Sequence, residues 1–166
     1  MRPIAFIGMP GSGKSTVARL VAAELGFDFF DSDAYIERKL KMTIPQIFER
    51  RGESAFRAAE TTVIAELCTK ENAVLSLGGG AVLFNEAVIS ERCLTVRLIR
   101  DIERIYAALK AQAGARPLAQ SKSDLTAIYN ARHEIYERIA DISADNNSSP
   151  EQAVNYIMEE LSKCGY

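Results

Sequence analysis

The segment from Gly8 to Ser15 reads GMPGSGKS, and it constrains this chain more than any other stretch. It fits the pattern GxxxxGK[ST], directly after an apolar run at residues 4–7 and directly before an amphipathic stretch. In that setting glycines let backbone N–H groups wrap a phosphate, Lys14 reaches the β- and γ-phosphates, and the Ser15 hydroxyl ligates Mg²⁺. A turn that only joined a strand to a helix would need no lysine beside it. The sequence therefore predicts binding of a nucleoside triphosphate.

Length and charge narrow the remaining choices. A chain of 166 residues fits one domain with one core, so we expect residues 1–166 to form a single domain. The net charge of -2 gives no bulk positive field to recruit nucleic acid or an anionic membrane. No apolar run is long enough to span a bilayer, and the apolar run at residues 4–7 leaves no room for a signal peptide before it. We expect a cytoplasmic monomer that holds anionic ligands with locally placed donors.

Cysteine and histidine usage argues against several kinds of chemistry. Cys68, Cys93 and Cys164 are widely spaced without a CxxC pair, and His133 is the one histidine. This set does not match a metal site or a disulfide framework, and a single histidine makes nucleophilic Ser/His or Cys/His catalysis improbable. We expect all three cysteines to be buried free thiols.

Apolar runs alternate with amphipathic stretches along the chain. This alternation is typical of a parallel sheet with helices on both faces, so we predict a three-layer α/β/α fold with about five buried strands. Ser149 as N-cap, Pro150 at N1 and Gln152 at N3 mark the start of the last helix. The predicted strands are residues 4–7, 27–30, 73–77, 94–99 and 142–144.

Residues 111–124 read AQAGARPLAQSKSD and are poor in bulky apolar side chains. The alternative is a plain surface connection. Because a loop of about a dozen residues is long for a compact domain, we predict a mobile lid here. Arg116 would be its cation, closing over the transferring phosphoryl group.

Two aspartates follow the second predicted strand. Asp31 and Asp33 lie at its carboxyl end, where open α/β sheets place their ligands. We assign Asp33 to the acceptor hydroxyl, as the group that takes its proton, and Asp31 to the Mg²⁺ shell. The competing interpretation is that one of them is the N-cap of a helix over residues 34–41.

Gly78, Gly79 and Gly80 end the third predicted strand. Three glycines in succession cost backbone entropy, which close approach of a ligand to backbone N–H groups would explain. A simple bend from strand to loop is the alternative.

Two arginines differ in their helical neighbours. Arg57 has Glu53 at i-4, and spacing alone favours an exposed ion pair on a helix. Arg132 has Ile128 and Tyr136 at i±4 and no carboxylate at i±3, so it is free to meet a ligand. A guanidinium suits a carboxylate or phosphate because it binds them with two parallel hydrogen bonds.

Together these motifs resemble the shikimate kinase family over nearly the whole chain. The matching segments are GMPGSGKST, Asp31-Ser32-Asp33, Gly52-Glu53-x-x-Phe56-Arg57, Gly78-Gly79-Gly80, Arg116-Pro117-Leu118 and Arg132-x-x-x-Tyr136. The resemblance implies ATP-dependent phosphorylation of the 3-hydroxyl of shikimate, with Mg²⁺, in aromatic amino-acid biosynthesis.

The resemblance also implies site residues. The shikimate site would comprise Asp33, Arg57, Gly78, Gly79, Gly80 and Arg132, with both arginines on the carboxylate. The ATP site would comprise Gly11, Ser12, Gly13, Lys14, Ser15, Thr16, Arg116 and Asn146. The alternatives are another small-metabolite kinase, such as a gluconate kinase, and a nucleotide-binding module without catalysis. A nucleoside monophosphate kinase is disfavoured because it has no use for a carboxylate clamp.

Overall fold

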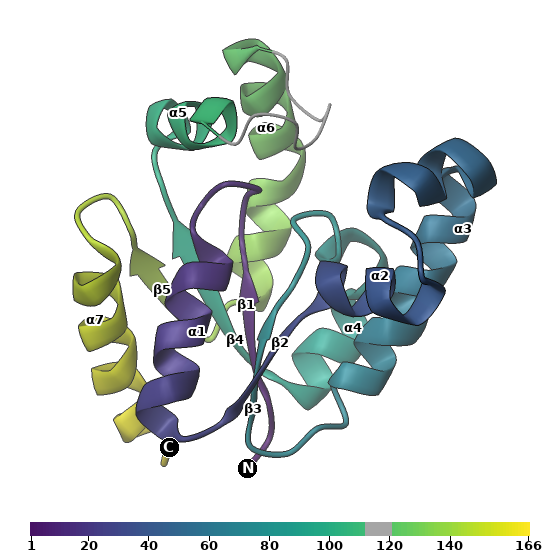
Figure 1. Cartoon of the computed structure of the whole chain (residues 1–166). Helices are drawn as coiled ribbons and strands as arrows, with labels where there is room; N and C mark the ends of the chain where they lie inside the picture. Colours follow the sequence, from purple (N-terminus) through teal and green to yellow (C-terminus); the bar gives the residue numbers. More distant parts are fainter. Residues whose placement is uncertain (112–120) are drawn as a thin grey trace.

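A computed structural model describes residues 1–111 and 121–166 of the chain (Figure 1). In these residues five parallel strands form one sheet, as the alternation of apolar runs predicts. The strand order in this sheet is β2-β3-β1-β4-β5. The strands are β1 (Ile4–Ile7), β2 (Asp28–Asp31), β3 (Ala73–Ser76), β4 (Leu94–Ile99) and β5 (Ile142–Asp145). The helices are α1 (Lys14–Leu25), α2 (Ser32–Leu40), α3 (Ile44–Leu67), α4 (Val82–Arg92), α5 (Ile102–Ala111), α6 (Lys122–Ile139) and α7 (Pro150–Lys163).

The central strand β1 separates two hydrophobic cores. Ile4 and Phe6 pack with α1 and α7 on one face of the sheet, whereas Ala5 and Ile7 face α3, α4 and α6 on the other. Because successive side chains of a strand point to opposite faces, a strand buried on both sides is apolar throughout. The result is the predicted three-layer arrangement, visible in Figure 1 with α1 and α7 in the left half of the view and α3 and α4 in the right half.

The expectation of five buried strands is wrong at the second strand. In β2 the side chain of Asp28 is exposed and the next three residues are only partly buried. β2 forms one edge of the sheet and pairs only with β3 among the described residues, so α1 and α2 cover it incompletely. Burial in β5, at the opposite edge, alternates with exposure along the strand.

Helix ends correct one prediction and confirm another. Ser121 caps α6, accepting from Asp124 N while its own N–H donates to the Asp124 carboxylate, and Ala111 ends α5. Residues 111 and 122–124 of the predicted loop are therefore helical, because this capping box satisfies the first turn. Residues 112–120 of that loop, Arg116 included, lie outside the described residues. The predicted start of α7 is confirmed, since Ser149 Oγ accepts from Gln152 N.

Two further expectations concern the surface. Cys68 and Cys93 are buried, but Cys164 is exposed at the end of α7, so the prediction of three buried thiols is wrong for it. Within residues 1–111 and 121–166, the helices are all too short or too polar to cross a membrane.

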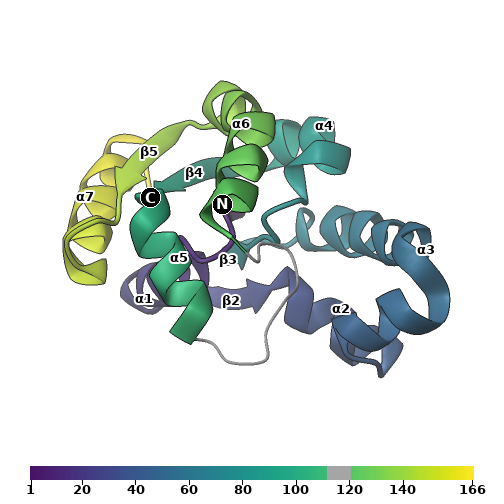
Figure 2. The ribbon, with the colours of Figure 1, turned by 90° about the horizontal axis from the view of Figure 1, so that it is seen from above.

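The functional end of the fold lies above the carboxyl ends of the strands. Figures 1 and 2 place α5 and the start of α6 on one side of this end and α2 and α3 on the other. The loop after β1 and the loop after β3 both emerge between them. The loops after β1 and β3, which are far apart in the sequence, therefore lie close together at this end of the sheet.

Candidate active site

The loop from β1 to α1 has the conformation that a phosphate cradle needs. Gly8, Gly11 and Gly13 have φ angles of 138°, 78° and 95°, which residues other than glycine rarely adopt. Lys14 is 8% exposed, and its ammonium donates to Gly8 O at 3.0 Å and to Met9 O at 2.9 Å. The lysine thus folds back over the loop, and its charge lies where phosphates would replace carbonyl oxygens as acceptors.

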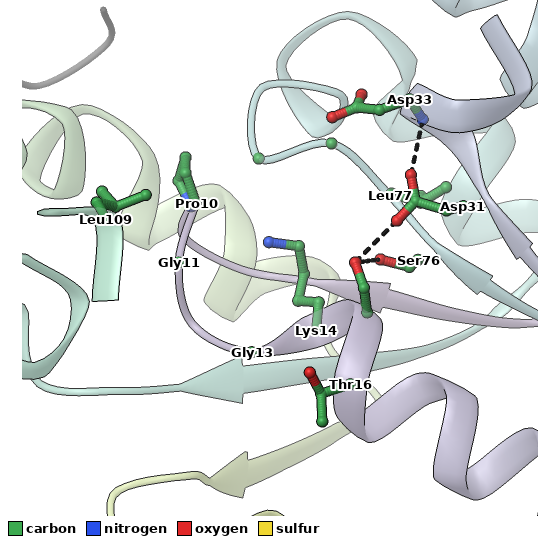
Figure 3. A pocket seen from close by; sticks show the side chains of 13 residues that line it. Pro10, Gly11, Gly13, Lys14, Thr16, Asp31, Asp33, Ser76, Leu77 and Leu109 are labelled. Atoms are coloured by element: carbon green, nitrogen blue, oxygen red, sulfur yellow. Dashed lines mark hydrogen bonds between the residues drawn. The ribbon is translucent and has the colours of Figure 1, made fainter. Parts of the chain in front are cut away.

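A hydrogen-bonded set of oxygen atoms joins α1 to the sheet. Ser15 Oγ donates to Asp31 Oδ2 at 2.8 Å and lies 3.0 Å from Ser76 Oγ (Figure 3). Asp31 and Ser76 are register partners at the carboxyl ends of β2 and β3, so the sheet itself places both beside Ser15. The structure therefore unites Ser15 and Asp31 and adds Ser76, which the sequence did not single out.

Asp31 is also the N-cap of α2. Its Oδ1 accepts from Asp33 N at 3.1 Å and from Ala34 N at 3.2 Å, while Oδ2 accepts from Ser15. The two interpretations of this residue are compatible, because each carboxylate oxygen serves one partner. Capping fixes the side chain and so presents Oδ2 to the Ser15 hydroxyl.

Each of the three consecutive glycines lies against a different part of the site. A Cβ on Gly78 would lie 2.9 Å from Asp33 Oδ1, one on Gly79 2.7 Å from Pro10 Cδ, and one on Gly80 3.1 Å from Arg57 Nη1. Their φ angles lie outside the left-handed region, so close approach and not backbone strain accounts for them. The sequence predicts close approach of a ligand to these glycines, whereas the atoms that lie close to them in the structure belong to the protein, and their contact with a ligand stays a prediction.

One cavity of about 340 Å³ joins the phosphate cradle to three of the predicted acceptor residues, Asp33, Gly78 and Gly79, whereas Arg57, Gly80 and Arg132 are not among its lining residues. Figure 3 shows Asp31 and Asp33 on one side of it and Pro10 and Leu109 on the other, with Lys14 between them. Its volume is in the range of small-molecule sites. The lining residues are Pro10, Gly11, Gly13, Lys14, Ser15, Thr16, Asp31, Asp33, Ser76, Leu77, Gly78, Gly79 and Leu109.

Arg57 has a buried partner that the sequence did not indicate. Its Nη1 donates to Glu60 Oε2 at 2.7 Å, whereas the predicted partner Glu53 is 3.4 Å away and exposed. Glu60 is 1% exposed, and this burial raises the pKa of its carboxyl group, opposed by the Arg57 hydrogen bond. The signal in the sequence is a carboxylate within the apolar stripe of α3, four residues after Phe56.

The charges around Glu60 show which predicted residues the fold brings together. The fields of Arg57 and Arg132 lower the pKa of Glu60, and that of Asp33 raises it. Three predicted acceptor residues, on α2, α3 and α6, therefore lie within electrostatic reach of one carboxylate. Arg132 makes no salt bridge with a carboxylate among the described residues, in line with the sequence.

Tyr136 ties α6 to the glycine loop. Its hydroxyl donates to Gly79 O, and burial raises the pKa of the phenol while nearby Arg132 opposes that change. Tyr136 lies one helical turn after Arg132 on α6. This hydrogen bond therefore fixes the position of Arg132 relative to the glycine loop. The Arg132-x-x-x-Tyr136 spacing in the sequence thus places the arginine one helical turn before a tyrosine that is hydrogen-bonded to the glycine loop.

Asn146 lies behind the phosphate cradle. Its amide nitrogen donates to Ser12 O at 2.8 Å, and a Cβ on Gly13 would be 2.5 Å from that nitrogen. The side chain is buried and supports the loop, and its predicted contact with ATP stays a prediction. Thr16 lines the cavity, and Ser12 is buried within the loop.

With this geometry in place, comparison with known proteins gives a consistent answer. The family model described as "Shikimate kinase" matches residues 10–162. The chain belongs to the shikimate kinase family. The shikimate kinase of Burkholderia thailandensis is 39% identical, covering 98% of this chain and 91% of the relative. That of Bacillus subtilis is 36% identical, covering 96% and 89%.

Solved structures agree with this family assignment. A shikimate kinase from Acinetobacter baumannii, solved in complex with shikimate, has a TM-score of 0.90 at 34% identity and covers 98% of this chain and 94% of its own. A gluconokinase from Sinorhizobium meliloti reaches a TM-score of 0.61 at 16% identity, with coverage of 98% and 93%, which shows a common fold alone. The family assignment makes the chain an ATP-using transferase and does not favour the gluconate kinase alternative.

Proposed function

We propose that this enzyme transfers the γ-phosphoryl group of ATP to the 3-hydroxyl of shikimate, giving shikimate 3-phosphate and ADP. The observation that carries the proposal is the shared cavity, which places the phosphate cradle and Asp33 at one opening. Beside it, Arg57 and Arg132 supply two guanidinium groups around Glu60. A relative solved with shikimate has nearly the same fold.

The nucleotide would lie on the α1 side of the cavity. Backbone N–H groups of residues 11–16 at the start of α1 would receive the phosphates, and Lys14 would exchange its carbonyl acceptors for β- and γ-oxygens. This exchange aims positive charge at the group that moves. Electrostatic stabilisation of this kind is the main contribution that a protein makes to phosphoryl transfer.

The oxygen atoms beside Ser15 fit Mg²⁺. Magnesium prefers oxygen ligands and keeps several waters, and Ser15 and Asp31 offer a hydroxyl and a carboxylate 2.8 Å apart. The described residues contain no group of three or more His, Cys, Asp or Glu suited to a metal, so phosphate oxygens and water would complete the shell. When bound, the ion neutralises charge on the phosphates.

Shikimate would lie on the α2 and α3 side. Asp33 would accept the proton of the shikimate 3-hydroxyl. The oxygen of that hydroxyl would bond to the γ-phosphorus, while the bond from this phosphorus to the oxygen that bridges the β- and γ-phosphates breaks and ADP leaves. Arg57 and Arg132 would hold the carboxylate, and Gly79 and Gly80 would border the ring. The lack of a side chain at Gly80 leaves space for the Arg57 guanidinium. Arg116, outside the described residues, is proposed as the cation of the closing segment.

A coupled assay of ADP release tests the proposal. With Mg²⁺ and ATP we expect turnover with shikimate and only the background rate with gluconate. No turnover above background with shikimate would refute the substrate assignment. Turnover with gluconate alone would favour the other kinase. That the enzyme acts as a cytoplasmic monomer stays a prediction.

A further inference from the structure

Phe84 is the most exposed large hydrophobic residue in the described part of the chain, with 57% of its surface open to solvent. It lies in the first turn of α4, four residues after Gly80. Single exposed apolar residues are common and need no explanation by themselves. Phe84 differs because its ring lies over the guanidinium of Arg57, with Cζ 4.9 Å from the ring centroid.

Arg57 is confined on several sides. Glu60 accepts from Nη1 at 2.7 Å, and the backbone of Gly80 lies so close that a Cβ there would be 3.1 Å from Nη1. The ring of Phe56 lies 5.2 Å from Cζ, but that ring packs against Phe48 with 4.9 Å between the centroids. Phe84 therefore supplies the outer aromatic contact of this guanidinium.

The start of α4 holds Phe84 in this place. Asn85 leaves helical geometry, with φ of -132°, and its buried amide donates to Ala81 O at 2.9 Å. This hydrogen bond closes the first turn directly after the glycine loop. The ring is thus fixed relative to Gly80 and not carried on a free loop.

An aromatic ring over a guanidinium does two things. It attracts the cation through its negative face, and it removes water from one face of the charge. The remaining N–H groups then point to the edge of the fork, where a carboxylate binds with two hydrogen bonds. At Arg57 the groups on that edge, Nε and Nη2, each donate to the exposed Glu53 at 3.4 Å and have no other hydrogen-bond acceptor within the described residues.

We propose that Phe84 is a positioning residue for shikimate, holding the Arg57 guanidinium in the orientation that receives the carboxylate. The inference rests on the proposed function, since it takes Arg57 as a carboxylate ligand. It assigns Phe84 a role in substrate affinity, acting through Arg57. The acceptor affinity should change, while the nucleotide site, on the other side of the cavity, should not.

Phe84→Leu is the central variant because it keeps an apolar side chain and removes the π face. We expect the KM for shikimate to rise about three- to tenfold, with kcat and the KM for ATP nearly unchanged. Isothermal titration of shikimate into the ADP-bound enzyme should show the same loss in Kd. Phe84→Tyr should restore wild-type affinity, since it keeps the ring.

Two controls separate a positioning role from general damage. Leu83→Ala removes an apolar side chain that is 41% exposed in the same turn and should leave all constants near wild type. Arg57→Lys removes the flat fork, and in that background Phe84→Leu should cost less than in the wild type. Thermal unfolding of each variant checks that it is folded.

The outcomes are distinguishable. An unchanged shikimate KM in Phe84→Leu, or an equal loss in Phe84→Tyr, would overturn the role of Phe84. A fall in kcat with unchanged shikimate affinity would also overturn it. If Arg57→Ala itself left shikimate affinity unchanged, the proposed carboxylate site would fail, whatever Phe84 does.

Discussion

Glu60, buried behind the acceptor side of the cavity, accepts a 2.7 Å hydrogen bond from Arg57, the residue that we assign to the substrate carboxylate. A buried carboxylate in contact with a substrate-binding guanidinium has two consequences. It orients the arginine, and it makes the stability of the protein depend on pH. The second consequence can be measured without substrate.

Glu60→Gln should remove part of the pH dependence of stability. Burial raises the pKa of Glu60 above its ordinary value of 4.5, so the native state binds this proton more tightly than the unfolded state. The stability that Glu60 contributes is full below that value and is lost as pH rises through the native pKa. The unfolding free energy of Glu60→Gln relative to wild type should therefore increase as pH rises above 4.5.

Urea denaturation at a series of pH values measures this difference. Glu53→Gln is the matched control, because it removes the exposed partner of the same arginine and keeps Glu60. It should keep the wild-type slope. A constant difference between Glu60→Gln and wild type across the range would contradict the prediction.

Asp33→Asn should lower kcat by about 10²- to 10⁴-fold, the usual contribution of a positioned base. The KM for ATP should stay near its wild-type value, because Asp33 lies on the acceptor side of the cavity and the phosphates of ATP would lie near Lys14. Steady-state kinetics with both substrates varied would show this split. Asp28→Asn, at the exposed start of β2, the strand that precedes α2, is the control and should behave as wild type. An unchanged kcat in Asp33→Asn would remove Asp33 from the role of base.

Lys14→Ala should disable the enzyme with any acceptor. Its ammonium is the buried cation of the phosphate cradle, and loss of one such donor costs about 10²- to 10³-fold in kcat. Assays of ADP release, with fluorescence titration of a labelled ATP analogue, would measure rate and binding separately. Lys163→Ala, on the outer surface of α7, controls for loss of a lysine. Wild-type turnover in Lys14→Ala would exclude its role.

Gly79→Ala should damage both halves of the site. Its Cβ would lie 2.7 Å from two ring carbons of Pro10, so either the glycine loop or the phosphate cradle must shift. Since a displacement of about 1 Å near the reacting groups can cost 10²-fold, we expect a loss of that order in kcat/KM for both substrates. Gly26→Ala is the contrast, because a Cβ there would have no heavy atom of the described residues within 4 Å apart from its chain neighbours. It should lower stability through its φ of 67° and leave the kinetics intact.

Much of this fold follows from local sequence. The strands β1, β3 and β4 are short apolar runs bounded by glycine or polar residues, and the caps of α7 are visible in the sequence. The exposure of β2 could not be predicted, because its place at the edge of the sheet depends on strand order. The polar composition of residues 122–124 favours a loop, but the capping box of Ser121 and Asp124 makes these residues the first turn of a helix.

The candidate site likewise contains residues that the local sequence predicts and residues that only the tertiary structure brings together. Residues in a contiguous motif, from Gly11 to Thr16, were predicted because one loop supplies them all. Ser76 was missed, since its contact with Ser15 spans 61 residues and depends on the pairing of β2 with β3. Glu60 was missed because spacing allows Arg57 two acidic partners, and only the packing of α3 shows which one is buried.

The three cysteines should differ in reactivity. Cys68 and Cys93 are buried with 3.3 Å between their sulfur atoms, and the hydrogen bond to Cys68 together with burial raises the pKa of Cys93. Because a maleimide must reach the sulfur atom, it should label the exposed Cys164 in the native protein and the two buried cysteines only after unfolding. Mass spectrometry would then find one label per chain before denaturant and three after it. Cys164→Ser should abolish the native label, whereas Cys93→Ser should keep it. Equal labelling of all three in the native state would contradict the buried pair.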